Sequence, residues 1–186
     1  MLIIDDFLDR FSELREYADI AVFEDVVNPI DGVVYPLICA DIPERIQAEI
    51  FAKLEDFKGS PIESPTIFMR RSPAGVQVPH AVHSDMSMGT HSLMLYLNRP
   101  AHCQGGTSFL SHKATGIGYN PDHPAFADIV VSDQNNYDAW TIRDMIAMKP
   151  NRAAIFDASR LHRAEPSGGF GTTPRDMRVV LTCFFS

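Results

Sequence analysis

From residue 65 onward the sequence is broken into short β-prone runs, and this feature constrains the fold more than any other. The runs lie at 66–71, 76–83, 91–98, 107–112, 140–148, 153–158 and 177–186, separated by Gly, Pro and Asn. Seven short strands in such a span are typical of a β-sandwich or a jelly-roll barrel. With 45% apolar residues in 186, we expect one domain over 1–186. The predicted class is mainly β with flanking helices (α+β).

The first 64 residues are expected to form a helical N-terminal support for the core at 65–186. An apolar stripe within residues 5–19 predicts one helix. A second helix is predicted after Asp41 as its cap, with Pro43 in the first turn and Gly59 just past its end.

The stretch at about 119–139 is polar and rich in turn residues, with "NPDHP" and "SDQNN". Inside a β-rich core, such a stretch indicates a surface insertion or lid. We expect it to shape the mouth of a substrate pocket.

Composition narrows the possible partners and the compartment. A formal charge of −8 and a pI near 5.2 make a duplex nucleic acid an unexpected partner. A local basic patch of Arg70, Arg71 and Arg99 is the exception that the sequence permits. No apolar run reaches the roughly 18 residues of a membrane span, so no membrane association is expected. Three dispersed cysteines without a CxxC pair fit a cytoplasmic protein.

The segment "VPHAVHSD" (78–85) offers two histidines and one aspartate as candidate metal ligands. Side chains two positions apart on a strand share a face, so His83 and Asp85 can address one ion. His80 lies five positions from Asp85 and would face the other way. Geometry therefore favours His83 over His80, although a His-x-Asp pair alone is more often an ordinary surface pair.

A third ligand is available in "DASRLHRAEP", where His162 follows the strand-like run at 153–158. His83, Asp85 and His162 would make two imidazoles and one carboxylate. This set, with other positions left open, is the signature of non-haem Fe(II) oxygenases.

Arg178 opens the last predicted strand, in which both faces are largely apolar. A buried guanidinium is costly without an anion, and a bidentate carboxylate ligand would satisfy it. The alternative is that Arg178 lies at an exposed strand start and pairs with Asp176 or solvent.

Together these segments resemble the 2-oxoglutarate/Fe(II)-dependent dioxygenases, in particular their prolyl 4-hydroxylase-like branch. The similar segments, in family order, are "HSD" (83–85), "LYLN" (95–98), "GGTSF" (105–109), "LHRAEP" (161–166) and "RVVLTCFF" (178–185). The resemblance covers residues 65–186 and looks closest to a bacterial and phage-associated subgroup. It implies a double-stranded β-helix, the jelly-roll core of the cupin-like proteins.

The resemblance also implies roles for individual residues. His83, Asp85 and His162 would bind iron, Arg178 would hold the distal carboxylate of 2-oxoglutarate, and Tyr96 would contact this cosubstrate. Arg175 competes for the role of Arg178, which keeps register with "LTCFF".

There are two further departures from the family pattern. Val180 stands where relatives often carry a small residue, so one hydrogen bond to the cosubstrate is missing. Thr107 stands where many relatives carry Glu.

The implied activity uses Fe(II), 2-oxoglutarate and O2 to hydroxylate a C–H bond of a peptide, an amino acid or another small molecule. Two alternatives remain open on the residues. One is a cupin-like hydrolase or isomerase with zinc or manganese. The other is a non-catalytic, metal-binding jelly-roll module.

Overall fold

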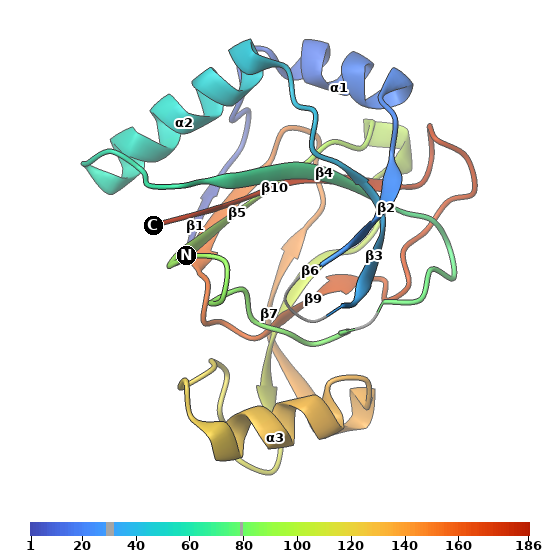
Figure 1. Cartoon of the computed structure of the whole chain (residues 1–186). Coiled ribbons are helices and arrows are strands. Elements are labelled where there is room, and N and C mark those ends of the chain that lie inside the picture. Colours follow the sequence, from blue (N-terminus) through green and yellow to red (C-terminus); the bar gives the residue numbers. More distant parts are fainter. Residues whose placement is uncertain (29–31, 79) are drawn as a thin grey trace.

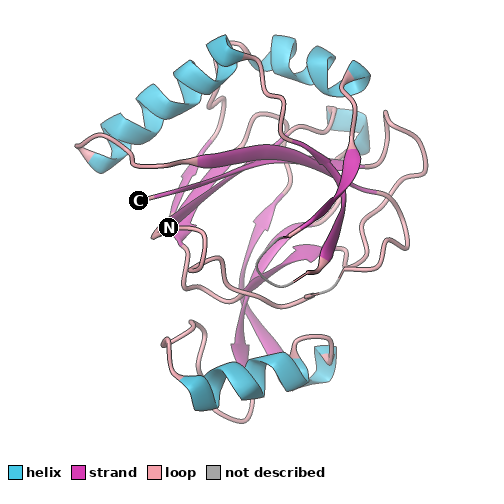
Figure 2. Ribbon diagram, viewed as in Figure 1, coloured by secondary structure: helices cyan, strands magenta, loops and turns pink. Residues whose placement is uncertain are grey.

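The computed structural model describes residues 1–28, 32–78 and 80–186. Two antiparallel sheets face each other, with helices outside the larger one (Figures 1 and 2). The strands are β1 (Leu2–Ile4), β2 (Glu24–Val27), β3 (Val34–Cys39), β4 (Thr66–Ser72), β5 (His91–Tyr96), β6 (Gly106–His112), β7 (Trp140–Ala147), β8 (Ala153–Asp157), β9 (His162–Glu165) and β10 (Arg178–Phe185). The helices are α1 (Phe11–Ile20), α2 (Glu44–Lys58) and α3 (Pro124–Asp133), with 3-10 turns at Pro100–His102 and Tyr137–Ala139. The predicted class, mainly β with flanking helices, is confirmed.

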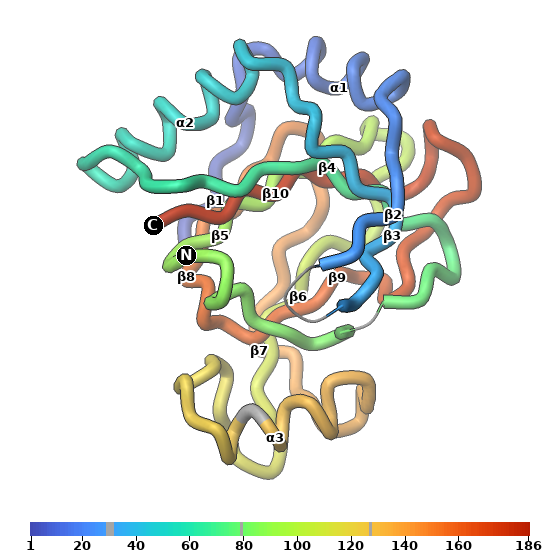
Figure 3. The backbone as a smooth tube through the Cα atoms, in the orientation of Figure 1, coloured from blue at the N-terminus to red at the C-terminus, as the bar shows by residue number. Residues whose placement is uncertain are grey.

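The larger sheet has the order β1-β8-β5-β10-β4-β3-β2, and the smaller has the order β7-β6-β9. β10 therefore lies between β5 and β4, in register with Tyr96 and Arg70 at Val180. Strands far apart in the chain become neighbours, as the tube in Figure 3 shows. The N-terminal segment shares this sheet, because β1, β2 and β3 extend both of its edges.

One face of the larger sheet packs against α1 and α2. Leu14, Ile46, Ile50 and Leu54 are fully buried there together with Leu181. A second apolar cluster lies on the inner face, between the two sheets; it contains Met94, Tyr96, Phe109, Ile146, Met148, Ala154, Phe156, Phe170 and Val180. Alternate residues of β10 thus enter two different cores, as the period-two geometry of a strand requires.

Six of the seven predicted strands are present, and the one predicted at 76–83 is not. Its described residues form turns and loop, with only an isolated bridge at His83, while Pro79 lies outside the described residues. The predicted cap of α2 is also wrong. Pro43 occupies the cap position, and no side-chain hydrogen bond caps the helix. Asp41 lies two residues before this position, and its carboxylate accepts a hydrogen bond from Tyr17 Oη instead. Gly59 ends α2 in the left-handed conformation, as predicted.

The stretch at 119–139 contains α3 and packs beside β6 and β7. Phe126 and Trp140 lie in a small buried cluster with Val82 and Leu161. These last two residues each precede a candidate metal ligand. The end of the insertion also holds the chain before His83, since Val82 N donates to Gln134 O at 3.0 Å. The insertion therefore supports the site as well as its surroundings.

No helix in the described ranges is long and apolar enough to cross a membrane.

Candidate metal centre

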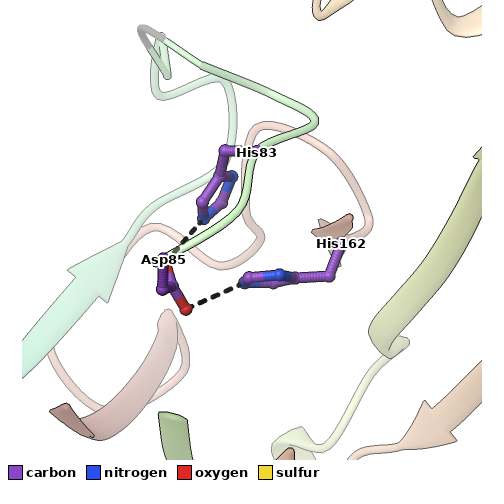
Figure 4. Close-up of side chains that lie close together, drawn as sticks. All are labelled: His83, Asp85 and His162. Atoms are coloured by element: carbon purple, nitrogen blue, oxygen red, sulfur yellow. Dashed lines mark ion pairs between the residues drawn. The ribbon is translucent and has the colours of Figure 1, made fainter. Parts of the chain in front are cut away.

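The structure brings His83, Asp85 and His162 together (Figure 4). They lie at one end of the space between the sheets, where the ring of His162 packs against Phe109 and Phe156. Asp85 Oδ1 lies 3.7 Å from His83 Nε2, and Asp85 Oδ2 lies 3.4 Å from His162 Nε2. All three ligand atoms lie within 4.8 Å of one another. Two atoms that each bind one ion at about 2.1 Å are at most ~4.2 Å apart, so both ion-pair distances fit a shared ion.

Backbone pairing places these ligands without a continuous strand. His83 and His162 exchange both backbone hydrogen bonds, at 3.1 and 2.9 Å. Asp85 N donates to Ala158 O at 2.8 Å, just past the end of β8. The expected pairing of His83 with Asp85 is found, but it comes from an isolated bridge and a loop rather than from a regular strand.

Both imidazoles present Nε2 to the cluster. His162 Nδ1 lies 2.9 Å from Arg160 O, and His83 Nδ1 lies 3.4 Å from Ala81 O. A carbonyl only accepts, so each Nδ1 carries a hydrogen, and in the neutral tautomer Nε2 is the nitrogen with the free lone pair. Such outer hydrogen bonds are typical of metal-binding histidines because they orient the ring.

The electrostatics of His83 also suit a metal ligand. Although 39% of its side-chain surface is exposed, burial of the ring among its neighbours, together with His162, lowers its pKa to about 4. The imidazole is therefore neutral at pH 7 and able to bind a cation. The exposed part of His83 marks the open side of the cluster.

Asp85 is oriented by a residue that the sequence did not single out. Ser92 Oγ donates to Asp85 Oδ2 at 2.8 Å from within the buried part of β5. The signal was available, because Ser92 shares a face with Met94 and Tyr96 on the same strand.

Arg178 lies at the other end of the same interior, 4% exposed. Its Nη2 contacts Met94 Sδ at 3.9 Å, and its Nε has no hydrogen-bond partner among the described residues. Burial lowers its pKa to about 10, so it remains a cation at pH 7. The predicted alternative, an exposed Arg178 paired with Asp176, is wrong. Arg175 is exposed and lies outside this interior.

Asn98, the last residue of "LYLN", fixes the start of β10. Its Nδ2 donates to Met177 O at 3.0 Å, and its Oδ1 accepts from Val179 N at 2.9 Å. These bonds flank Arg178 on both sides, so they set the direction of its side chain into the barrel.

Tyr96 is fully buried and lies opposite Val180 on the face of Arg178. Its Oη lies 3.0 Å from Thr107 Oγ1 and 3.2 Å from Ile146 O. Burial raises its pKa, so its hydroxyl stays protonated. Thr107 in turn donates to Met94 Sδ at 3.1 Å. Tyr96 is thus close to Arg178 but is engaged by the smaller sheet.

His80 stands outside the cluster. Its Nδ1 lies 2.9 Å from Gln134 Oε1, so it contacts the end of the insertion. The basic patch that the sequence permits is not formed by Arg70, Arg71 and Arg99 together. Arg71 and Arg99 gather near Asp19 on the outer side, whereas Arg70 points to the inner face in register with Val180.

No known family model matches this sequence, and no curated protein matches it either. Solved structures do match. A prolyl hydroxylase from Trichoplax adhaerens, in complex with a hypoxia inducible factor peptide fragment, matches over 99% of this chain and 82% of its own, with 15% identity and a TM-score of 0.54. EvdO2 from Micromonospora carbonacea var. aurantiaca, complexed with 2-oxoglutarate, matches over 99% and 85%, with 15% identity and a TM-score of 0.53.

A third match is EctD from S. alaskensis with 2-oxoglutarate and 5-hydroxyectoine, over 98% of this chain and 70% of its own, with 13% identity and a TM-score of 0.53. The resemblance to 2-oxoglutarate/Fe(II) dioxygenases, a prolyl hydroxylase among them, is confirmed at the level of the fold. The fold is the double-stranded β-helix, and it carries a candidate His-x-Asp…His metal site.

Proposed function

We propose that this protein is a non-haem Fe(II)- and 2-oxoglutarate-dependent dioxygenase that hydroxylates a C–H bond of a peptide, an amino acid or another small molecule. One observation carries the proposal. The His83, Asp85 and His162 cluster lies at one end of a barrel whose other end holds Arg178, without a carboxylate partner among the described residues.

The residues present fit Fe(II). Two imidazoles and one carboxylate form the facial set of such oxygenases, and they leave the other positions of the ion open. When bound, Fe(II) and 2-oxoglutarate supply the oxidising chemistry, in which O2 converts the 2-oxo acid to succinate and CO2 and one oxygen atom enters the substrate. Asp85 lowers the net charge of the site, and Ser92 holds it in place.

Arg178 fits the distal carboxylate of 2-oxoglutarate. Its guanidinium is buried and charged, and a planar pair of N–H groups matches a carboxylate. Asn98 keeps it directed inward. Tyr96 lies opposite Val180 on the same face, and its hydroxyl would make a second contact on turning from Thr107 and Ile146 toward the cosubstrate.

Phe109 and Phe156 exclude water from the inner side of the site. Their rings lie 6.0 and 5.0 Å from that of His162, and both side chains are buried. A dry pocket protects a reactive centre from side reactions. Met94 lies between this end and Arg178, where it contacts the guanidinium.

We further propose that residues 1–186 form one domain and that the protein acts in the cytoplasm. The core that joins α1, α2 and the larger sheet supports the single domain. The dispersed cysteines support the compartment.

Anaerobic addition of Fe(II) and 2-oxoglutarate tests the function. We expect a weak visible charge-transfer band in the wild type and its loss in a His83→Ala variant. The matched control is His80→Ala, which should keep the band because His80 lies outside the cluster. Succinate release with a panel of peptides and amino acids then reports turnover. A wild type that forms no band at saturating ligand but hydrolyses or isomerises substrate with zinc or manganese would contradict the proposal.

A further inference from the structure

The inner face of the larger sheet carries a second arginine, Arg70, which the proposed reaction does not use. Arg70 lies on β4 opposite Val180, and Ser72 lies on the same strand opposite Arg178. Arg70 and Arg178 therefore share one face of the sheet. They lie on neighbouring strands and are offset by two residue positions, which is about 7 Å along the strands. Arg70 is displaced from Arg178 toward the end of the barrel that holds the metal-binding cluster, since Phe184 and Ser92 lie further along in the same direction.

Arg70 is partly buried, and two nitrogens of its guanidinium lie fully inside the protein without a partner among the described residues. Its Nε and Nη2 are buried without a hydrogen bond. No ion pair joins it to a carboxylate among the described residues. The ring of Tyr35 is centred 5.9 Å from its Cζ, a cation–π contact that supplies no carboxylate. A charge buried in this way is costly unless a ligand pairs with it.

The residues around Arg70 on the inner face are more exposed to solvent than those around Arg178. The neighbours of Arg70 on the inner face, Ile38, Phe68 and Thr182, are only partly buried. On the other side of β10, Met94, Ala154 and Phe156 are buried below the smaller sheet. A ligand bound to Arg70 would not need the guanidinium of Arg178, because the two residues lie on neighbouring strands and are offset by two positions.

The unpaired nitrogens indicate the chemical class of the ligand. Nε and Nη2 lie on one edge of the planar guanidinium, so their hydrogens point in parallel. This fork matches the two oxygens of a carboxylate. A single guanidinium also balances the charge of one carboxylate, whereas a phosphate dianion calls for a second cation.

We propose that Arg70 binds a free carboxylate of the molecule that is oxidised. The primary substrate is then a small molecule such as an amino acid, or a chain end, that carries a carboxylate close to the reacting C–H bond. This inference rests on the proposed function. In that function the 1-carboxylate of 2-oxoglutarate would lie at the metal and Arg178 would hold the distal one, so Arg70 is left for a third carboxylate.

Acetate is the simplest probe of this site. In protein saturated with Mn(II) and 2-oxoglutarate, which does not turn over, the paramagnetic ion should enhance the relaxation of acetate methyl protons with saturable binding. Acetamide, which lacks the charge, should show no saturable effect. Arg70→Met should abolish the acetate effect and Arg70→Lys should keep part of it. Arg143→Gln is the matched control, because Arg143 lies on β7 in the smaller sheet and donates to Ser111 of β6.

Three outcomes would overturn the inference. Saturable acetate binding that persists in Arg70→Met would place the anion elsewhere, and the absence of any saturable effect in the wild type would show that the site does not take a carboxylate. A loss of 2-oxoglutarate affinity in Arg70→Met as large as in Arg178→Met would assign Arg70 to the cosubstrate. Failure of the proposed function is distinct, because the wild type would then form no Fe(II)/2-oxoglutarate band at all.

Succinate release gives the second measurement. Free amino acids should stimulate release in the wild type at least tenfold more than their C-terminal amides do. Arg70→Met should remove this preference. An equal response to acids and amides in the wild type would contradict a substrate carboxylate.

Discussion

Two groups of arginines lie on opposite faces of the same sheet, and they differ in whether the protein supplies their counter-ion. On the outer face, Arg15, Arg71 and Arg99 surround Asp19. On the inner face, Arg70 and Arg178 have no paired carboxylate among the described residues. Arg70 and Arg71 are neighbours in sequence, so the alternation of one strand separates the two groups.

The outer group has the character of a structural network. Arg15 is buried and pairs with Asp19 one helical turn away, while Arg99 Nη2 donates to Asp19 Oδ2 at 2.5 Å. Arg71 Nη2 donates to Ala18 O at 2.5 Å, and its Cζ lies 4.1 Å from the ring centre of Phe23. The inner group has no such set of partners. The difference indicates that the outer arginines stabilise the fold, whereas the inner ones are available to bind anionic ligands.

Replacing Arg178 by Met tests this distinction, and it should produce the largest change, a loss of affinity for 2-oxoglutarate. Losing a buried, bidentate charge pair costs about 2–5 kcal/mol, so 2-oxoglutarate should bind roughly 30-fold more weakly or worse, measured by anaerobic titration of the band. The melting temperature of the apo-protein should stay level or rise, because an unpaired buried charge is removed. Arg175→Met is the control and should bind normally. A normal affinity in Arg178→Met with a loss in Arg175→Met would reverse the assignment.

Replacing Asp19 by Asn should have the opposite profile and a smaller effect. Arg15 and Arg99 lose their shared carboxylate and Arg71 loses a nearby negative charge, so the free energy of unfolding should fall by about 1–3 kcal/mol. This corresponds to a drop of several degrees in melting temperature. The affinity for 2-oxoglutarate should remain that of the wild type. An unchanged melting temperature would remove the structural role assigned to the outer group.

The carboxyl group of Asp19 should also make the stability of the fold depend on pH. Burial raises the pKa of Asp19, but the hydrogen bond from Arg99 and the charge of Arg15 outweigh it and hold the pKa below the ordinary value of 3.8. A lowered pKa contributes stability that is complete above that value and is lost as the pH falls through the folded-state pKa. Stability should therefore decline below about pH 4, with a shallower slope in Asp19→Asn than in the wild type.

The sequence sufficed for the parts of the site that are set by local spacing and order. His83 with Asp85, His162 and Arg178 could be named because each belongs to a short segment whose order resembles that of a known family. The strand predicted at 76–83 was wrong, since β-prone residues there form a loop that the insertion holds through Gln134. Hydrogen bonds between distant segments override a local propensity in such a case.

The role of Arg70 could not be predicted from the sequence for a different reason. "RR" at 70–71 reads as one basic patch, and only the register of β4 with β10 shows which arginine faces inward. Nor does the sequence show that Asp19, some 50 positions earlier, balances the outer one. Both facts depend on which strands are neighbours and on what covers each face.

The smallest predicted effect concerns Val180, which lies in register between Arg70 and Tyr96 and is 4% exposed. Val180→Thr keeps the shape of the side chain and adds a hydroxyl on the inner face. One new hydrogen bond to the cosubstrate is worth about 0.5–1 kcal/mol, so 2-oxoglutarate should bind roughly two- to fivefold more tightly in the same titration.

Val179→Thr is the matched control, because Val179 is the next residue and faces the apolar core under the helices. It should lower stability without changing 2-oxoglutarate affinity, since its hydroxyl finds no ligand there. Equal affinity in both variants would show that the inner face near Val180 does not meet the cosubstrate. A gain in Val180→Thr alone would place the cosubstrate along β10 and extend the contrast between the two faces to a single pair of adjacent residues.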